Sequence, residues 1–205
     1  MQVIPCGWIN PEAICYIGRG ALLSPDILYR ELQDIEKTDD TIWNRVKIDY
    51  RAGLLERKHH QSEGGTEGTL HERIGSTGEG VGAARLDRIR RDPDHFNLAE
   101  DFPDSWMKDL LVDSVSKLAY ASQDDNVEIM LEGSQGFGLS LIHGNWPYVT
   151  SHDTNAATLF ADAGLPITGR RKIILVARSY PIRVAGNSGP MIHETNWDAI
   201  SLRMG

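Results

Sequence analysis

The chain has few cysteines, little positive charge and no long apolar run. Its 205 residues contain two cysteines, Cys6 and Cys15, too few for a disulfide framework or a cysteine metal site, so we expect a reducing cytoplasm. The net charge of -8 argues against a general nucleic-acid binder, which would show a basic footprint. No apolar run approaches the roughly 20 residues that span a bilayer, and residues 1–12 lack the charged and apolar regions of a signal peptide. We therefore expect a cytoplasmic protein that binds neither nucleic acid nor membrane.

Two common site motifs are also missing. The histidines are scattered without a metal-binding spacing such as HExxH, so the sequence assigns no metal ligand. No glycine-rich stretch is followed by Gly-Lys-Ser or Gly-Lys-Thr, so there is no Walker A loop. Internal repeats and low-complexity segments are absent as well. The length suits one domain or a piece of a larger one.

Expected strands alternate with expected helices, which predicts an α/β fold with a mixed or mostly parallel sheet flanked by helices. Ser24 and Pro25 mark a helix start, and the apolar face of that helix is formed by Ile27, Leu28, Leu32 and Ile35. Further helices are expected at Arg85–Arg91 and Phe102–Ser122. Strands are expected at Thr41–Ile48, Val127–Leu131 and Lys172–Ala177, and a strand or turn within Val3–Ile17.

Residues 59–82 are rich in glycine, serine and threonine, a composition typical of a flexible surface loop. The stretch ends in a dense motif, IGSTGEGVG, so we expect a mobile active-site loop within a single domain of residues 1–205. Glycines at alternate positions let backbone N–H groups converge on a phosphate oxygen. Ser76 and Thr77 add two hydroxyls. The following RLDRIRR segment is either a solvated helix face or, next to this loop, a source of phosphate-binding arginines.

Two apolar runs end in small polar groups fifteen residues apart. The first ends in EGSQGFG, where Gln135 could read a purine edge or simply face solvent in a turn. The second ends in YVTSHDT, where Thr150 and Ser151 offer hydroxyls to a phosphate or ribose. A hydrolase-like Ser/His/Asp arrangement has little support, because adjacent side chains of an extended segment point to opposite faces. A last glycine turn, in IRVAGNSGP (residues 182–190), could close over a ribose or be an ordinary loop.

In this order, GSTGEGVGAA, EGSQGFGLS, YVTSHDT and YPIRVAGNSGP resemble the adenylosuccinate synthetase family, as does IPCGWINPEAICYIGRGALLSPDIL near the start. These motif sequences look closer to the archaeal-type branch and to the related phage 2-aminoadenylosuccinate synthetases than to the common bacterial form. The resemblance implies a P-loop-NTPase-like synthetase fold, here without its N-terminal phosphate loop and its C-terminal part. Glu79 and the pair His152-Asp153 depart from the common bacterial pattern.

The resemblance also implies roles for single residues. Thr77 would hold the 5′-phosphate of a purine monophosphate beside Gly75 and Ser76, and Thr150 would contact the same phosphate. Gln135 would contact the purine ring and act in catalysis, and Val184 would contact the ribose. Arg91 would reach into the phosphate site of a neighbouring subunit, which implies a homodimer.

The family uses GTP, or ATP in the phage branch, with Mg²⁺ to phosphorylate the purine 6-oxygen of IMP, and the amine of L-aspartate then displaces that phosphate. The phage branch leaves dGMP open in place of IMP. The loops for the triphosphate, the general base and Mg²⁺ are expected before residue 1, and those for aspartate after Gly205. Three readings stay open: a truncated or split synthetase whose missing parts lie on a complementing polypeptide, an inactive protein that binds the monophosphate, or a decayed fragment without function.

Overall fold

The computed structural model describes residues 2–64, 69–102, 104–167, 171–179, 187–190, 195 and 197–204. Its strands are β1 (Cys15–Ile17), β2 (Leu22–Leu23), β3 (Val46–Asp49), β4 (Gly53–Leu54) and β5 (Leu111–Val112). Its α-helices are α1 (Pro25–Glu36), α2 (Ile42–Arg45), α3 (Arg57–Glu63), α4 (Thr69–Ile74), α5 (Val81–Arg90), α6 (Ser105–Lys108), α7 (Ser114–Ala121), α8 (Ala156–Ala163) and α9 (Trp197–Met204). Short 3-10 helices are η1 (Cys6–Ile9), η3 (Ala99–Asp101) and η4 (Phe137–Leu139).

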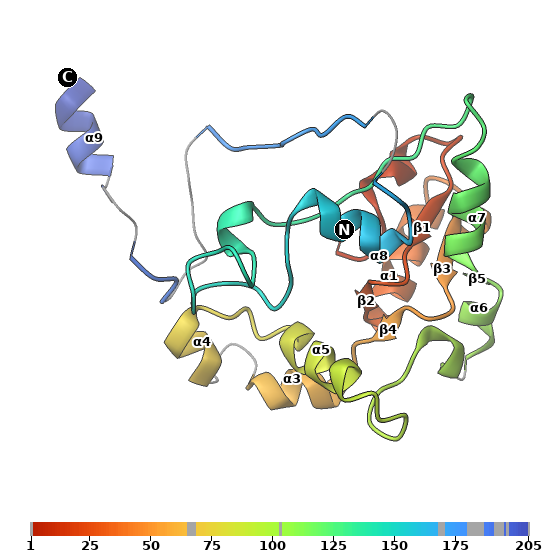
Figure 1. Ribbon diagram of the computed structural model, residues 1–205, viewed down its shortest axis with the longest axis horizontal. Coiled ribbons are helices and arrows are strands. Elements are labelled where there is room, and N and C mark those ends of the chain that lie inside the picture. The colour runs from red at the N-terminus through yellow and green to blue at the C-terminus, as the bar shows by residue number, and fades with distance from the viewer. Residues whose placement is uncertain are drawn as a thin grey trace.

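The strands form two parallel sheets. In the larger sheet β3 lies between β1 and β5, with Ile48 opposite both Ile17 and Leu111. The smaller sheet pairs β2 with β4. Helices flank these sheets. Helices α3, α4 and α5 lie together at the lower left of the sheets, with α5 in contact with β4, and α9 lies apart at the far end (Figure 1). The prediction of an α/β fold with a mostly parallel sheet is confirmed.

Helix α1 begins as predicted, with Ser24 before it and Pro25 in its first turn. Its apolar stripe is largely confirmed, since Leu28, Leu32 and Ile35 are buried. These side chains join the central strand residues Val46 and Ile48 in one hydrophobic core. A second, smaller cluster is formed where α7 meets α8, around Leu118, Ala163 and Leu165.

The predicted strand Thr41–Ile48 is wrong in its first half, because a helical turn, α2, precedes β3. The cause is the buried side chain of Arg45, which donates to the carbonyls of Trp8, Asn10 and Ala13 at 2.9–3.0 Å and pairs with Asp39. These contacts hold residues 8–13, including the second half of η1, against α2. Tertiary hydrogen bonds thus override the β propensity of the local sequence.

The predicted helix Phe102–Ser122 is also wrong, since α6, β5 and α7 divide this segment. Asp113 caps α7 by accepting a hydrogen bond from Ser116 N at 3.2 Å. The two residues Leu111 and Val112 form a strand because β3 offers them a parallel partner. A pattern of apolar residues at helical spacing therefore fits a helix–strand–helix unit as well as one long helix.

Neither Val127–Leu131 nor Lys172–Ala177 forms a strand, so both predictions are wrong. The second segment is highly exposed, with Leu175 at 88% and Val176 at 96%. A buried strand requires neighbours that accept its backbone hydrogen bonds, and the described strands all pair elsewhere. Residues 59–82 differ from the expected loop as well, because α3 ends and α4 lies within them.

Burial of His59 on α3 predicts a pH-dependent stability. Its ring is 1% exposed, Nδ1 accepts from Glu56 N at 3.0 Å, and Nε2 lies 3.4 Å from Asp87 Oδ2. Burial lowers the pKa of His59, and the charge of Lys58 lowers it further, against the opposing effects of Glu56 and Asp87. The folded state therefore binds this proton less readily than the unfolded state.

Consequently, the stabilisation from His59 should be complete above the unfolded pKa of about 6.5 and decrease as the pH falls below it, by at most about 1.4 kcal/mol per pH unit. Urea unfolding between pH 8 and pH 5 measures this slope. His59→Gln, which keeps an acceptor for the Glu56 N–H group, should flatten it. The matched variant His60→Gln should not, and an equal flattening in both variants would contradict the assignment.

Candidate functional site

Three of the segments singled out from the sequence meet in space. A Cβ placed on Gly82 would lie 3.6 Å from Ser151 Cβ, so the IGSTGEGVG segment contacts the YVTSHDT segment. A Cβ on Gly75 would lie 3.0 Å from the carbonyl oxygen of Asn187, so the IGSTGEGVG segment also contacts the IRVAGNSGP segment. Asn187 strengthens this contact by donating from Nδ2 to Arg73 O at 2.9 Å. Segments far apart in sequence therefore surround one region.

The loop from residue 136 to residue 154 closes on itself at this region. Thr150 N donates to Leu139 O at 2.8 Å, and Thr154 Oγ1 donates to Gly136 O at 3.0 Å. These bonds bring the segment carrying Gln135 beside the segment carrying Thr150. Turns and η4, not strands, form these segments.

Gln135 has an unusual backbone conformation. Its φ is +70°, in the left-handed region that non-glycine residues rarely adopt, and its side chain is exposed. Such conformations cost about 1–3 kcal/mol and occur preferentially at functional sites. This strain favours a functional Gln135 over the alternative of an ordinary turn glutamine, while its contact with a purine stays a prediction.

The turn before α5 contains the residues predicted to hold the phosphate. Gly75, Gly78 and Gly80 all have φ between +68° and +78°, which explains why glycine is required in this turn. The Ser76 hydroxyl accepts from Gly78 N at 3.2 Å. Thr77 is exposed on the same turn and is available to a ligand.

The backbone N–H groups expected to converge on a phosphate are occupied by a side chain. Gly80 N and Ala83 N each donate to the carboxylate of Glu63 at 3.0 Å, and Glu63 is 9% exposed. The prediction that alternate glycines here direct free N–H groups to a phosphate is therefore wrong for Gly80. Sequence reasoning missed Glu63 because it lies seventeen residues before Gly80 and only the packing of α3 on α5 brings it close.

Three of the four arginines of α5 and its end have different surroundings. Arg88 donates to the carbonyls of Arg19 and Arg51 at 3.0 and 3.2 Å, and Arg90 pairs with Asp87 at 3.0 Å. The side chains of Arg88 and Arg90 are therefore engaged in contacts within the chain. Arg91 follows the helix in the left-handed conformation, with φ of +58° and an exposed side chain.

The side chains of residues 151–153 diverge. His152 Nε2 lies 2.8 Å from Asp162 Oδ2 on α8, whereas Asp153 accepts from Ser140 Oγ at 2.5 Å and from Ile142 N at 3.2 Å. No described contact links Ser151 to either residue, so a Ser/His/Asp triad is not formed here.

Asp162 is the centre of a charged cluster next to this loop. Burial lowers the pKa of Arg85 and of Arg88, and the nearby Asp162 carboxylate partly opposes both shifts. A cavity of about 330 Å³ lies between Arg19, Arg88 and Asp162. This cavity contains none of the predicted monophosphate contacts.

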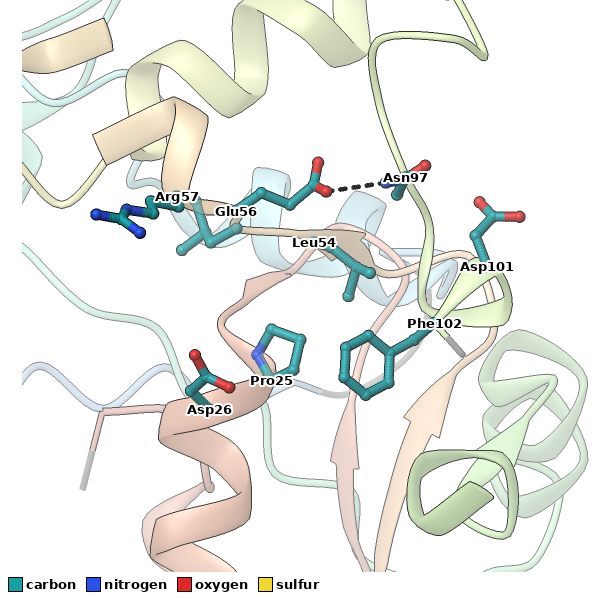
Figure 2. Close-up of a pocket in the computed structure, with 9 residues that line it drawn as sticks. Pro25, Asp26, Leu54, Glu56, Arg57, Asn97, Asp101 and Phe102 are labelled. Carbon is teal, nitrogen blue, oxygen red and sulfur yellow. Dashed lines mark hydrogen bonds between the residues drawn. The ribbon is translucent and has the colours of Figure 1, made fainter. Parts of the chain in front are cut away.

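A second cavity, of about 290 Å³, lies between β4, the start of α1 and the segment from Asn97 to Phe102 (Figure 2). Leu54, Pro25 and Phe102 point into it, and Glu56 accepts a hydrogen bond from Asn97 at its rim, at 2.9 Å. It contains none of the predicted site residues, so we assign it no role in the candidate site.

Three further expectations concern the ribose contact, a metal site and a membrane span. Val184 lies outside the described residues. Within the described ranges, no group of three or more His, Cys, Asp or Glu side chains could hold a metal ion. The helices that the structure describes include none that is long and apolar enough to cross a membrane.

The parallel sheets with flanking helices define an α/β protein, and its gathered glycine turns are of the kind found at nucleotide sites. The model of the family described as adenylosuccinate synthetase matches residues 1–96 and 97–203. The chain therefore belongs to the adenylosuccinate synthetase family.

Curated relatives support this membership. Adenylosuccinate synthetase of Pyrococcus horikoshii is 37% identical over 190 residues, which are 93% of this chain and 53% of that protein. The Methanococcus vannielii enzyme is 38% identical over 93% of this chain and 54% of its own length. The chain thus spans about half the length of the curated relatives it matches. The predicted archaeal-type resemblance is confirmed.

Two solved structures share the fold. One is a cyanophage S-2L succinoaminodeoxyadenylate synthetase bound to dGMP and dATP as an energy donor. It is 28% identical with a TM-score of 0.63, covering 81% of this chain and 45% of that one. The other is a fully ligated adenylosuccinate synthetase from Plasmodium falciparum, with a TM-score of 0.68. At 17% identity, over 82% of this chain and 47% of that one, it supports the fold alone.

Proposed function

We propose that this chain carries the purine monophosphate site of an adenylosuccinate synthetase. The observation that carries the proposal is the meeting of the segments around Gly75, Gly82, Ser151 and Asn187, which lie far apart in sequence. In this site Thr77, with Gly75 and Ser76, binds the 5′-phosphate, and Thr150 contacts the same phosphate. Gln135 contacts the purine and acts in catalysis, and Val184 contacts the ribose.

The proposed reaction is the ligation of L-aspartate to IMP, with GTP as phosphate donor and Mg²⁺, in purine biosynthesis in the cytoplasm. The described residues include no group of three or more ligating side chains suited to a metal. No magnesium ligand is therefore assigned among the described residues. Residues for the triphosphate and for aspartate are likewise not assigned, and a complementing polypeptide could supply them.

A second candidate substrate is dGMP, with ATP or dATP as donor. The cyanophage protein, which is similar over 81% of this chain, was solved bound to dGMP and dATP. IMP and dGMP present the same 5′-phosphate to the phosphate-binding turn. IMP and dGMP differ at the purine 2-position and at the 2′-position of the sugar, and no described residue is assigned to either position.

The proposed assembly is a homodimer in which Arg91 completes the site of the partner copy. Arg91 is exposed at the end of α5 and makes no side-chain hydrogen bond or ion pair that the described part of the chain reveals. Leu86 and Ile89, at 53% and 73% exposure, add apolar surface to the same helix. Sedimentation of the purified chain with and without IMP tests this assembly, and a monomer under both conditions would contradict it.

Calorimetric titration of the purified chain with IMP and, in parallel, with dGMP tests the proposed function. Saturable binding of either nucleotide supports a monophosphate site, and the preferred ligand identifies the substrate. A folded chain that binds neither would contradict the proposal. Turnover assays with the triphosphate, Mg²⁺ and L-aspartate then separate a ligase from a protein that only binds the monophosphate.

Removing the Thr77 hydroxyl should weaken monophosphate binding about tenfold or more, because a hydrogen bond to a charged group contributes about 1.5–3 kcal/mol. Arg91→Ala should have a similar effect. Thr150→Ala should weaken binding more than Ser151→Ala, which is its matched control on the same loop. Wild-type affinity in both Thr77→Ala and Arg91→Ala would contradict the phosphate assignment.

A further inference from the structure

The end of α3 contacts the start of α5 through Glu63, which is not one of the proposed nucleotide contacts. The carboxylate of Glu63 accepts hydrogen bonds from Gly80 N and Ala83 N, both at 3.0 Å. It therefore occupies the N-terminus of α5, where free N–H groups and the helix dipole attract an anion. A phosphate cannot use these two groups while Glu63 holds them.

The backbone packs tightly around the same contact. A Cβ on Gly80 would lie 2.8 Å from the backbone of His59 and His60, and a Cβ on Gly82 would lie 2.8 Å from Glu63 Oε1. Gly80 also has φ of +78°. The end of α3 thus fixes both the position and the conformation of the turn that presents Thr77.

We propose that Glu63 is a positioning residue for the phosphate-binding turn. Its carboxylate takes the place of an anion at the start of α5, holds residues 78–83 in one conformation, and leaves the exposed Thr77 as the group of this turn that meets the nucleotide phosphate. The inference rests on the proposed monophosphate site and identifies a residue that organises that site without touching the ligand.

The first test compares Glu63→Gln with Glu72→Gln, an equal change of charge on the exposed face of the neighbouring helix α4. The amide introduced by Glu63→Gln keeps the size of the side chain but turns a donor toward one of the two N–H groups. IMP affinity should fall about tenfold or more in Glu63→Gln and stay at the wild-type value in Glu72→Gln. Amide exchange at Gly80 and Ala83 should accelerate in Glu63→Gln, while amides in the core strands keep their protection.

The second test uses Glu63→Ala with acetate added as a replacement carboxylate. Acetate should restore part of the IMP affinity and the amide protection of Gly80 and Ala83, and it should do neither in the wild type. Equal or tighter IMP binding by Glu63→Ala without acetate would overturn the proposal, since Glu63 would then compete with the phosphate. Unchanged exchange at Gly80 and Ala83 in both variants would overturn it as well.

The two proposals fail in distinguishable ways. If the wild type binds neither IMP nor dGMP, the proposed function fails, while amide exchange still shows whether Glu63 holds the turn. If the wild type binds IMP and Glu63→Gln binds it equally well, only the positioning role fails.

Discussion

Asp49→Ala should lower the free energy of unfolding by about 3 kcal/mol or more, because each buried polar group left without a partner costs about 1–3 kcal/mol. Asp49 ends the central strand β3 and is 0% exposed. Its carboxylate accepts from Arg19, from the Arg51 N–H group, and from both Ser114 N at 3.0 Å and Ser114 Oγ at 2.7 Å. Burial by itself would raise the pKa of Asp49, but these hydrogen bonds outweigh it and hold the pKa below its ordinary value.

The loss would be large because Ser114, also 0% exposed, would keep a hydroxyl and an N–H group without their partner. Urea unfolding at pH 7 measures the change. Asp34→Ala, which removes an exposed ion pair with Lys37, serves as the control and should change stability little. Similar stability losses in the two variants would show that the Asp49 contacts do not hold β3 to α7.

Gly80→Ala should lower the free energy of unfolding by about 2 kcal/mol or more and also weaken IMP binding. The left-handed conformation alone costs a non-glycine residue about 1–2 kcal/mol, and the new Cβ would overlap the backbone of α3 at 2.8 Å. Backbone atoms cannot rotate away as a side-chain end could, so the turn that carries Thr77 must shift.

Gly136→Ala is the matched control for this variant. Gly136 has φ of -90°, and a Cβ there would meet nothing within 4 Å. Thermal unfolding and IMP titration of both variants separate a general effect of alanine from the effect of close packing. Normal stability and affinity in Gly80→Ala would contradict the described contact between the turn and α3.

Local patterns in the sequence carried much of the prediction. The start of α1 followed from Ser24 and Pro25, whose backbone preferences act without help from distant residues. Motif wording predicted the family, which matches over nearly the whole chain. Glycines in the turn before α5 predicted a loop whose N–H groups converge on a phosphate; the turn is present, but Gly80 N donates to Glu63. The roles of Thr77, Thr150 and Arg91 stay predictions.

Elements that depend on long-range partners could not be read in this way. The two residues of β5 are a strand because β3 lies beside them, and α2 is helical because Arg45 reaches carbonyls more than 30 residues away. The apolar run Lys172–Ala177 has strong strand propensity, yet no described strand pairs with it. Propensity sets a preference of less than about 1 kcal/mol per residue, which tertiary contacts easily exceed.

By itself, therefore, the sequence determined the family, the α/β class, the first helix and the glycine turn, because each depends on residues close together along the chain. Only the tertiary structure decided which groups face the candidate site. It assigned Arg88 to backbone carbonyls and left Arg91 exposed. It also placed Glu63 on Gly80 and Ala83. The physical reason is that a hydrogen bond is directed and needs its partner within about 3 Å, a distance that packing alone sets for residues far apart in sequence.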